Sequence, residues 1–135
     1  MTGTITQAAL IPASPLDVYL AIVDPAIHAR FTQTPATGDP VVGGTFTAWA
    51  GYIRGRHLEL RPGELIVQEW STTEWPEGVA PSRLEIRLSA NGDGTRLDLR
   101  QTEVPLEQID DYAQGWHEYY WEPLRAFFGG ATGSS

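Results

Sequence analysis

Residues 105–128 have the sequence PLEQIDDYAQGWHEYYWEPLRAFF and contain the longest periodic pattern in the chain. Their large apolar side chains recur about every 3.6 residues, which is the period of an α-helix. Acidic residues near the start and Arg125 near the end suit the helix dipole, and Gly129 and Gly130 are expected to end the helix. The expected apolar face consists of Ile109, Tyr112, Trp116, Tyr119, Tyr120, Leu124 and Phe127.

Two residues of this segment are unfavourable inside a helix. Gly115 costs about 1 kcal/mol relative to alanine, and Pro123 has no amide hydrogen to donate. We expect the sheet to approach closely at Gly115, and we expect a bend near Pro123 that lets the helix follow a curved surface.

Upstream of the helix, apolar and polar residues alternate with the two-residue period of half-buried strands. Residues 91–94, NGDG, are the strongest turn signal in the chain, and residues 84–88 and 97–99 alternate on either side of it. This pattern predicts a hairpin whose inward parity continues through Gln101 and Glu103. Further strands are expected at residues 4–11, 44–49, 52–61 and 65–72.

Two short helices are expected after the first strand. Ser14 offers a capping hydroxyl directly before Pro15, a residue favoured at the first position of a helix. Asp24 and Pro25 repeat this signal and predict a second helix that ends near Phe31.

The composition limits the class of protein. With 135 residues, 41% hydrophobic and 19% charged, the chain is expected to form one domain over residues 1–130, with residues 131–135 as a flexible tail. A net charge of −8 argues against nucleic acid and anionic membranes as partners. The lack of cysteine excludes disulfides and thiolate chemistry. With no signal peptide and no apolar run of about 20 residues, a cytoplasmic protein without a membrane span is expected.

No catalytic or cofactor motif is present in the sequence. His28, His57 and His117 lack the spacing of metal ligands, so surface or packing roles are expected for them. We therefore expect no metal, no cofactor and no identifiable catalytic residue.

The strand at residues 52–61 allows two orientations of Arg54. If Leu58 and Leu60 point inward, regular alternation also turns Arg54 inward, where it could bind an anionic group. A bulge at Gly55 would instead place Arg54 in solvent. The orientation of His57 is open for the same reason.

Aromatic residues are the most informative feature of the chain, which has five tryptophans and five tyrosines. They fit a plain core, and they also fit the lining of an apolar pocket between a sheet and a helix. A buried amide such as Gln68 or Gln101 has the same two interpretations, because it either satisfies a neighbouring group or orients a ligand.

Segments along nearly the whole chain are similar in order and spacing to the signatures of one family. They are 31-FTQ-33, 43-GGTF-46, 55-GRHLELRP-62, 66-IVQEW-70, 75-WPEG-78, 104-VP-105 and 115-GWHEYYWEPL-124. Together they resemble the homologues of the activator of heat-shock protein 90 ATPase, within the START-like (SRPBCC) superfamily. The chain resembles only the C-terminal domain of the eukaryotic activators.

The resemblance implies an α+β helix-grip fold. In this fold a curved antiparallel sheet of about six strands surrounds a long C-terminal helix, with two short helices after the first strand. It also implies a cavity between sheet and helix, which holds apolar molecules in other members of the superfamily.

Three functions follow as hypotheses. The first is a binding protein that encloses a small apolar or aromatic ligand between helix and sheet. The second is a co-chaperone-like partner of a heat-shock protein 90 type chaperone, and the third is a cyclase-like enzyme using Arg54, His57 or Glu69. A homodimer could form through a strand edge or an aromatic patch. The residues expected to bind the ligand are Phe46, Trp49, Trp70, Trp116, Tyr120, Gln68, Gln101 and Arg54.

Overall fold

The computed structural model describes residues 2–130, so the tail expected at residues 131–135 lies outside the described residues. Strands and short helices form the first four fifths of the chain. They are β1 Thr2–Ile11, α1 Pro15–Val23, α2 Pro25–Thr32, β2 Thr37–Gly38, β3 Thr45–Ala48, β4 Ile53–Arg61, β5 Leu65–Thr72, β6 Ser82–Asn91 and β7 Gly94–Pro105. The closing helix consists of a 3-10 turn Leu106–Gln108, α3 Ile109–Trp116, a π turn His117–Trp121, α4 Glu122–Arg125 and a π turn Ala126–Gly130.

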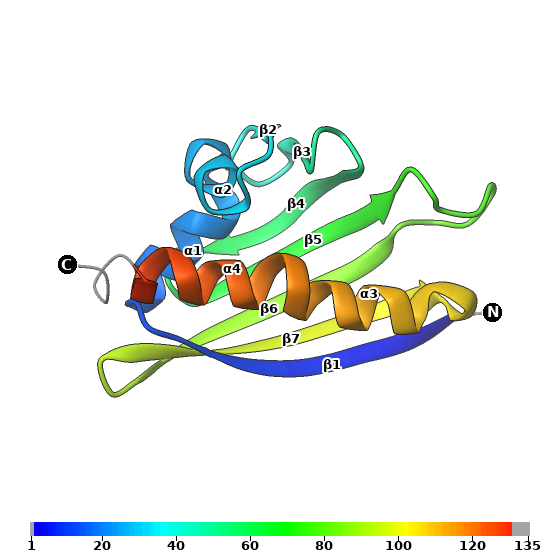
Figure 1. The fold of residues 1–135 in the computed structure, drawn as a ribbon. Helices are drawn as coiled ribbons and strands as arrows, with labels where there is room; N and C mark the ends of the chain where they lie inside the picture. The colour runs from blue at the N-terminus through cyan, green and yellow to red at the C-terminus, as the bar shows by residue number, and fades with distance from the viewer. Residues whose placement is uncertain (1, 131–135) are drawn as a thin grey trace.

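The seven strands form one antiparallel sheet in the order β1-β7-β6-β5-β4-β3-β2, and the closing helix lies along one face of it (Figure 1). This confirms the α+β helix-grip fold. The sheet has seven strands where about six were expected, because the short β2 pairs with β3 through Thr37 and Thr47. Among residues 2–130, no helix is both long and apolar enough to cross a membrane.

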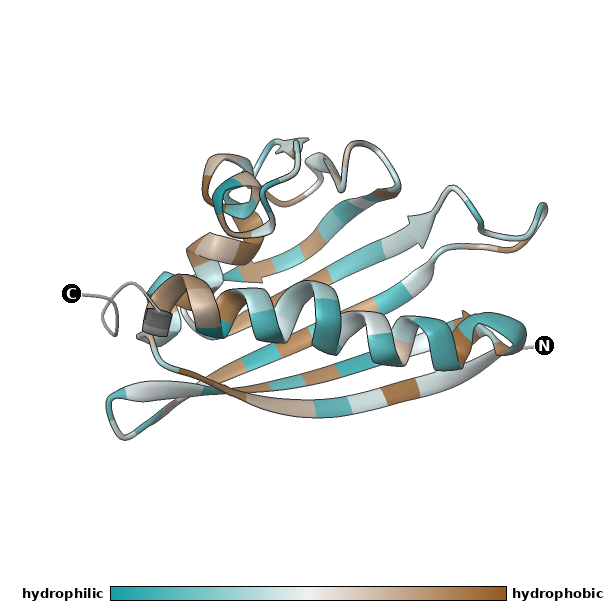
Figure 2. Cartoon of the chain, in the orientation of Figure 1, coloured by the Kyte–Doolittle hydropathy of each residue, from teal (hydrophilic) through white to brown (hydrophobic). Residues whose placement is uncertain are grey.

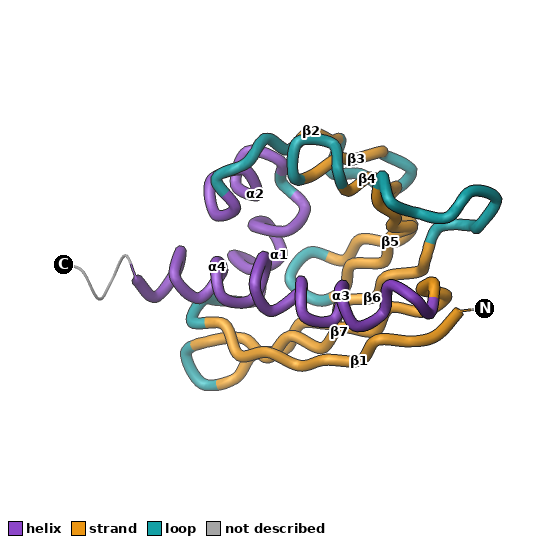
Figure 3. The backbone as a smooth tube through the Cα atoms, turned by 45° about the vertical axis from the view of Figure 1, so that its right-hand side comes forward, coloured by secondary structure: helices purple, strands orange, loops and turns teal. Residues whose placement is uncertain are grey.

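Both short helices begin where the sequence predicts. The Ser14 side chain accepts a hydrogen bond from the Asp17 amide at 3.2 Å, and the Asp24 carboxylate accepts one from the Ala26 amide at 2.9 Å. α2 lies against β2, β3 and α4, at the edge of the sheet opposite β1 (Figure 3).

The closing helix is continuous, as predicted, and its outward face is largely hydrophilic (Figure 2). Just before Pro123, where a bend is expected, the helix contains a π turn in which the Glu122 amide donates to the His117 carbonyl. The prediction for Gly115 is wrong. A Cβ atom there would meet only Tyr119 Cδ2, at 3.6 Å, so the sheet does not approach this glycine.

A β-bulge settles the orientation of β4. The pairing with β5 shifts between His57 and Glu59, so the extra residue is Leu58, and the bulge lies three residues after Gly55, the position considered in the sequence. His57 is buried and Arg54 is exposed. Ile53 and His57, which share one parity before the bulge, are therefore the residues of β4 that are buried.

A second bulge corrects the predicted parity of β7. The pairing of β1 with β7 shifts between Gly3 and Ile5, and Glu103 adopts a left-handed φ of 63°. Gln101 is buried as expected, but Glu103 is exposed. The extra residue in the ladder turns Glu103 away from the core.

The turn between β3 and β4 is built from residues that do not favour its conformation. Trp49 and Ala50 have positive φ angles of 54° and 57°, a region that costs an L-residue about 1–2 kcal/mol. The Ala50 amide donates to the Pro35 carbonyl at 3.0 Å, and the Gly51 amide donates to the Ala48 carbonyl at 3.2 Å. These bonds hold Trp49 at the tip of the hairpin.

Ala50→Gly is expected to raise the free energy of unfolding by about 1 kcal/mol, because glycine adopts this φ without steric cost and keeps the amide donor. Ala50 is exposed, so little packing is lost. Urea denaturation measures the change. The exposed Ala90, on β6, provides the control, since Ala90→Gly should lower stability; a loss in both variants would contradict the strain at Ala50.

Candidate functional site

A chain of buried hydrogen bonds attaches the closing helix to the middle of the sheet. The Trp116 indole N–H donates to Gln101 Oε1 at 3.0 Å, and Gln101 Nε2 donates to Ser82 Oγ at 2.9 Å. Ser82 Oγ in turn donates to the Trp70 carbonyl at 2.7 Å. Gln101 is 0% exposed, so its amide joins Trp116 to Ser82 without contact with solvent.

A second glutamine attaches the same helix to β1. Gln7 Nε2 donates to the Ala113 carbonyl at 2.6 Å, and the Trp121 indole donates to Gln7 Oε1 at 2.9 Å. The two bonds of each amide fix the position and the rotation of the helix on the sheet.

Three aromatic side chains form a wall between helix and sheet, which we call the aromatic wall: Trp70, Trp116 and Tyr120. The ring centroids of Trp70 and Trp116 are 5.6 Å apart, and those of Trp116 and Tyr120 are 4.8 Å apart. All three residues are buried, and all three line a hollow on either side of the wall.

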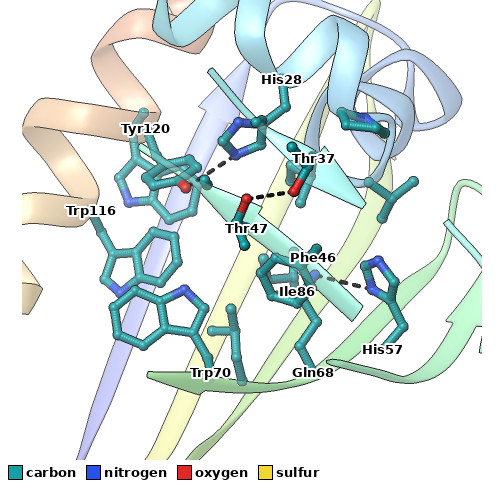
Figure 4. Close-up of a pocket in the computed structure, with 17 residues that line it drawn as sticks. His28, Thr37, Phe46, Thr47, His57, Gln68, Trp70, Ile86, Trp116 and Tyr120 are labelled. Atoms are coloured by element: carbon teal, nitrogen blue, oxygen red, sulfur yellow. Dashed lines mark hydrogen bonds between the residues drawn. The ribbon is translucent and has the colours of Figure 1, made fainter. Parts of the chain in front are cut away.

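The inner hollow lies between the wall, α2 and β3 (Figure 4). Its free volume is about 30 Å³, enough for about two water molecules. Phe46, His28, His57 and Gln68 contribute to its lining. This space is too small for an organic ligand of the kind predicted to lie between sheet and helix.

Two buried histidines face the inner hollow. His28 Nε2 lies 3.1 Å from the Tyr120 hydroxyl, and His57 Nδ1 lies 3.4 Å from Gln68 Nε2. Burial lowers the pKa of His28 to about 4 and also lowers the pKa of His57, where the charge of Asp39 partly opposes it. Both rings are therefore neutral at neutral pH.

The outer hollow is an open groove with a volume of about 690 Å³, which we call the aromatic groove. It lies between the closing helix, the β3–β4 turn and the end of β5. Its lining residues are Trp49, Tyr52, Ile53, Trp70, Glu74, Gln108, Asp111, Tyr112, Gln114, Gly115, Trp116, Glu118, Tyr119 and Tyr120.

Contacts across the groove hold its two sides together. Trp49 meets Tyr119 edge to face, with ring centroids 5.3 Å apart, so the strained hairpin tip contacts the π turn. The Tyr112 hydroxyl lies 2.6 Å from Thr72 Oγ1. Gln108 Nε2 donates to the Glu74 carbonyl at 2.7 Å, which ties the loop after β5 to the start of the helix.

The groove reaches the helix at Gly115. Since a Cβ atom at this position would meet only Tyr119 Cδ2, the glycine leaves open space along the helix between the rings of Tyr112 and Tyr119. The missing side chain therefore shapes the groove.

The structure separates the eight residues predicted to bind a ligand. Trp49 lines the groove together with the aromatic wall, whereas Phe46 and Gln68 line the inner hollow. Gln101 lies behind Trp116 and reaches neither hollow. Arg54 is exposed and lines a shallow depression on the other face of β4, beside Glu69.

The three residues named for an enzyme do not meet. His57 is buried among core residues, while Arg54 and Glu69 lie on the outer face of the sheet. Glu69 forms an ion pair with Arg56 at 3.1 Å. Within residues 2–130, no group of histidine, aspartate and glutamate side chains could hold a metal ion.

Sequence reasoning missed most of the groove's polar and tyrosine lining. Asp111, Gly115 and Glu118 follow each other at helical spacing, which could have indicated one shared face. Tyr52 and Glu74 come from loops and strand ends far from the helix in sequence, and no local pattern predicts their approach.

Residues 12–129 match the family described as "Activator of Hsp90 ATPase homolog 1-like protein". The chain belongs to this family. The Hsp90-activator family match covers the groove, the wall and every element except β1, in agreement with the resemblance seen in the sequence.

Curated relatives include an "Activator of 90 kDa heat shock protein ATPase homolog" from Dictyostelium discoideum, 34% identical over 76% of this chain, and the human homolog 1, 30% identical over 95%. The chain spans only 27% and 38% of their lengths. The crystal structure of an Hsp90 activator from Plasmodium falciparum has a TM-score of 0.82 at 22% identity and covers 94% of this chain and 96% of its own, which shows the same fold.

Gln101→Leu is expected to lower the free energy of unfolding by about 2 kcal/mol, because the buried Trp116 indole loses its acceptor. Urea denaturation of this variant, of Trp116→Phe and of the double variant forms a double-mutant cycle. The double variant should be clearly more stable than the sum of the single losses predicts. Additive losses would show that the indole–amide bond does not couple helix and sheet.

Stability should fall in mild acid because of the buried histidines. The unfolded His28 takes up a proton near its usual pKa of 6.5, whereas the folded one does so only near 4. Burial of neutral His28 therefore has no pH-dependent cost above about pH 6.5. As the pH falls from there toward 4, the free energy of unfolding decreases, by about 2 kcal/mol at about pH 5. Urea midpoints at about pH 7.5 and 5 measure this. Between these two pH values His28→Gln should lose less stability than the wild type, and His117→Gln, at an exposed site, should lose as much stability as the wild type. Equal losses of stability in all three proteins would contradict the role of His28.

Proposed function

We propose that the chain is an interaction protein that binds a chaperone of the heat-shock protein 90 type and uses the aromatic groove as its contact surface. The observation that carries the proposal is the match of residues 12–129 to a family whose curated members are named activators of that chaperone's ATPase.

The form of the site supports a protein partner. The enclosed space is limited to about 30 Å³, whereas the open groove offers about 690 Å³ along the helix. Among the residues that line the groove, Tyr119 is 52% exposed, and Trp49 and Tyr52 are partly exposed. Tyrosine and tryptophan are enriched among the residues that contribute most to protein interfaces.

A cytoplasmic location and a homodimer paired through β1 complete the proposal. β1 forms the outer edge of the sheet, and its ten residues include no charged side chain. Charged residues are one means by which proteins prevent pairing between edge strands.

Gly115→Leu is expected to weaken chaperone binding by about tenfold or more, because the new side chain occupies the groove. Leucine favours the helix more than glycine does, and a Cβ atom at this position would meet only Tyr119 Cδ2, at 3.6 Å, so folding should be retained. Isothermal titration calorimetry with a purified heat-shock protein 90, with and without an ATP analogue, measures the affinity.

The control is His117→Leu, which adds the same side chain to an exposed helix position outside the groove. It should bind like the wild type. If the wild type binds no such chaperone in either nucleotide state, the proposed function is wrong. If it binds and Gly115→Leu binds equally well, the groove is not the contact surface.

A small apolar or aromatic ligand in the groove is the second candidate. The groove volume lies within the range of small-molecule sites, and aromatic rings dominate the lining. Native mass spectrometry of the purified chain, followed by organic extraction, would reveal a reproducible adduct that Gly115→Leu abolishes. A clean mass together with unchanged tryptophan fluorescence across a panel of aromatic compounds would exclude this candidate.

A further inference from the structure

The aromatic groove is acidic, and its charge has no counterpart within the described lining. Three carboxylates line it: Glu74 from the loop after β5, and Asp111 and Glu118 from the closing helix. None of the lining residues is an arginine, a lysine or a histidine. Because like charges gather at one hollow, a cationic occupant is favoured there and an anionic one is repelled.

The arginines of residues 2–130 do not neutralise this charge. The ion pairs that the structure shows join Arg56 with Glu69, Arg61 with Glu59, Arg87 with Glu85, and Arg96 with Asp98. None of these carboxylates belongs to the groove. The groove carboxylates instead accept neutral hydrogen bonds, Glu74 from the Tyr52 hydroxyl and Glu118 from Gln114 Nε2.

The aromatic lining adds a second requirement. Trp49, Tyr52, Tyr112 and Tyr119 surround the space that Gly115 leaves open. Their rings attract the apolar stem of a long side chain, and ring faces also attract a cationic head group. An ammonium group alone would satisfy the carboxylates but would leave the aromatic surface uncovered.

We propose that the aromatic groove binds a segment of a partner protein in which arginine or lysine alternates with large apolar residues. The identity of that partner as the chaperone rests on the proposed function, but the chemistry of the segment does not. In the bound state the apolar side chains cover the rings beside Gly115, and the cationic groups pair with Glu74, Asp111 and Glu118.

The direct test uses two short capped peptides as probes, one alternating leucine with arginine and the other leucine with glutamate. Binding is followed through the indole N–H signals in ¹H–¹⁵N NMR spectra. The basic peptide should shift the signal of Trp49, which lines the groove, in a saturable way. Trp121, which is 0% exposed and bonded to Gln7, should not shift and provides an internal reference.

A matched pair of triple variants tests the role of the charges. Glu74→Gln with Asp111→Asn and Glu118→Gln removes the groove carboxylates and should weaken the basic peptide about tenfold, since each exposed pair contributes about 0.2–1 kcal/mol. The control triple, Glu107→Gln with Asp110→Asn and Glu122→Gln, changes the net charge equally at exposed positions outside the groove and should bind like the wild type. Circular dichroism confirms that both variants are folded.

Three results would overturn the inference: the two peptides bind equally, neither peptide binds, or both triple variants weaken the basic peptide alike. The chaperone measurement separates this outcome from the proposed function. If the chaperone binds the wild type and the groove triple variant equally, the inference fails and the function stands. If the basic peptide binds as expected but no chaperone does, the function fails and the groove chemistry stands.

Discussion

The hydrogen bonds between indoles and glutamine amides determine how the rest of the molecule is arranged. Gln101 and Gln7, on the neighbouring strands β7 and β1, each accept an indole N–H from the closing helix. A helix held only by apolar contacts could rotate or slide, because such contacts have no direction. Two directed bonds, made about one turn apart at Trp116 and Trp121, allow only one orientation of the helix about its own axis. That orientation turns Trp116 and Tyr120 toward the sheet and Asp111 and Glu118 toward the groove.

The aromatic wall explains why the expected internal cavity is small. Trp70 from β5 reaches Trp116 and Tyr120 from the helix, and together they fill the space that a curved sheet leaves around a helix. The remaining inner space holds about two waters and is lined by the neutral rings of His28 and His57. The larger hollow lies on the other side of the wall, where the β3–β4 turn brings Trp49 against Tyr119.

Sequence patterns predict the features that depend on residues close together in the chain, such as helix starts, turns and the helical period. The caps at Ser14 and Asp24, the turn at residues 91–94 and the period of the closing helix all correspond to elements of the structure. Four of the predicted binding residues do line the groove, because large aromatic residues near the helix tend to meet the sheet.

The errors arise where one residue changes parity or where distant segments meet. The bulge near Glu103 reverses an assignment based on strict alternation, and the bulge at Leu58 decides an orientation that alternation leaves open; no turn residue in the sequence marks either of them. A glycine inside a helix suggests close contact with a neighbouring element, whereas Gly115 leaves open space beside Tyr119. Glu74 lies in the loop after β5, far from the closing helix in sequence, so only the tertiary fold brings it to the groove.

The π turn at residues 117–121 contains one residue more than the α turn it replaces. Two consecutive tyrosines of this turn serve different sides of the helix, Tyr120 in the aromatic wall and Tyr119 at the groove. A relative with a single-residue deletion here would keep its flanking helix in register and its core aromatic residue, yet lose one wall of the groove. The length of this turn therefore affects the shape of the groove as much as the identity of any one side chain does.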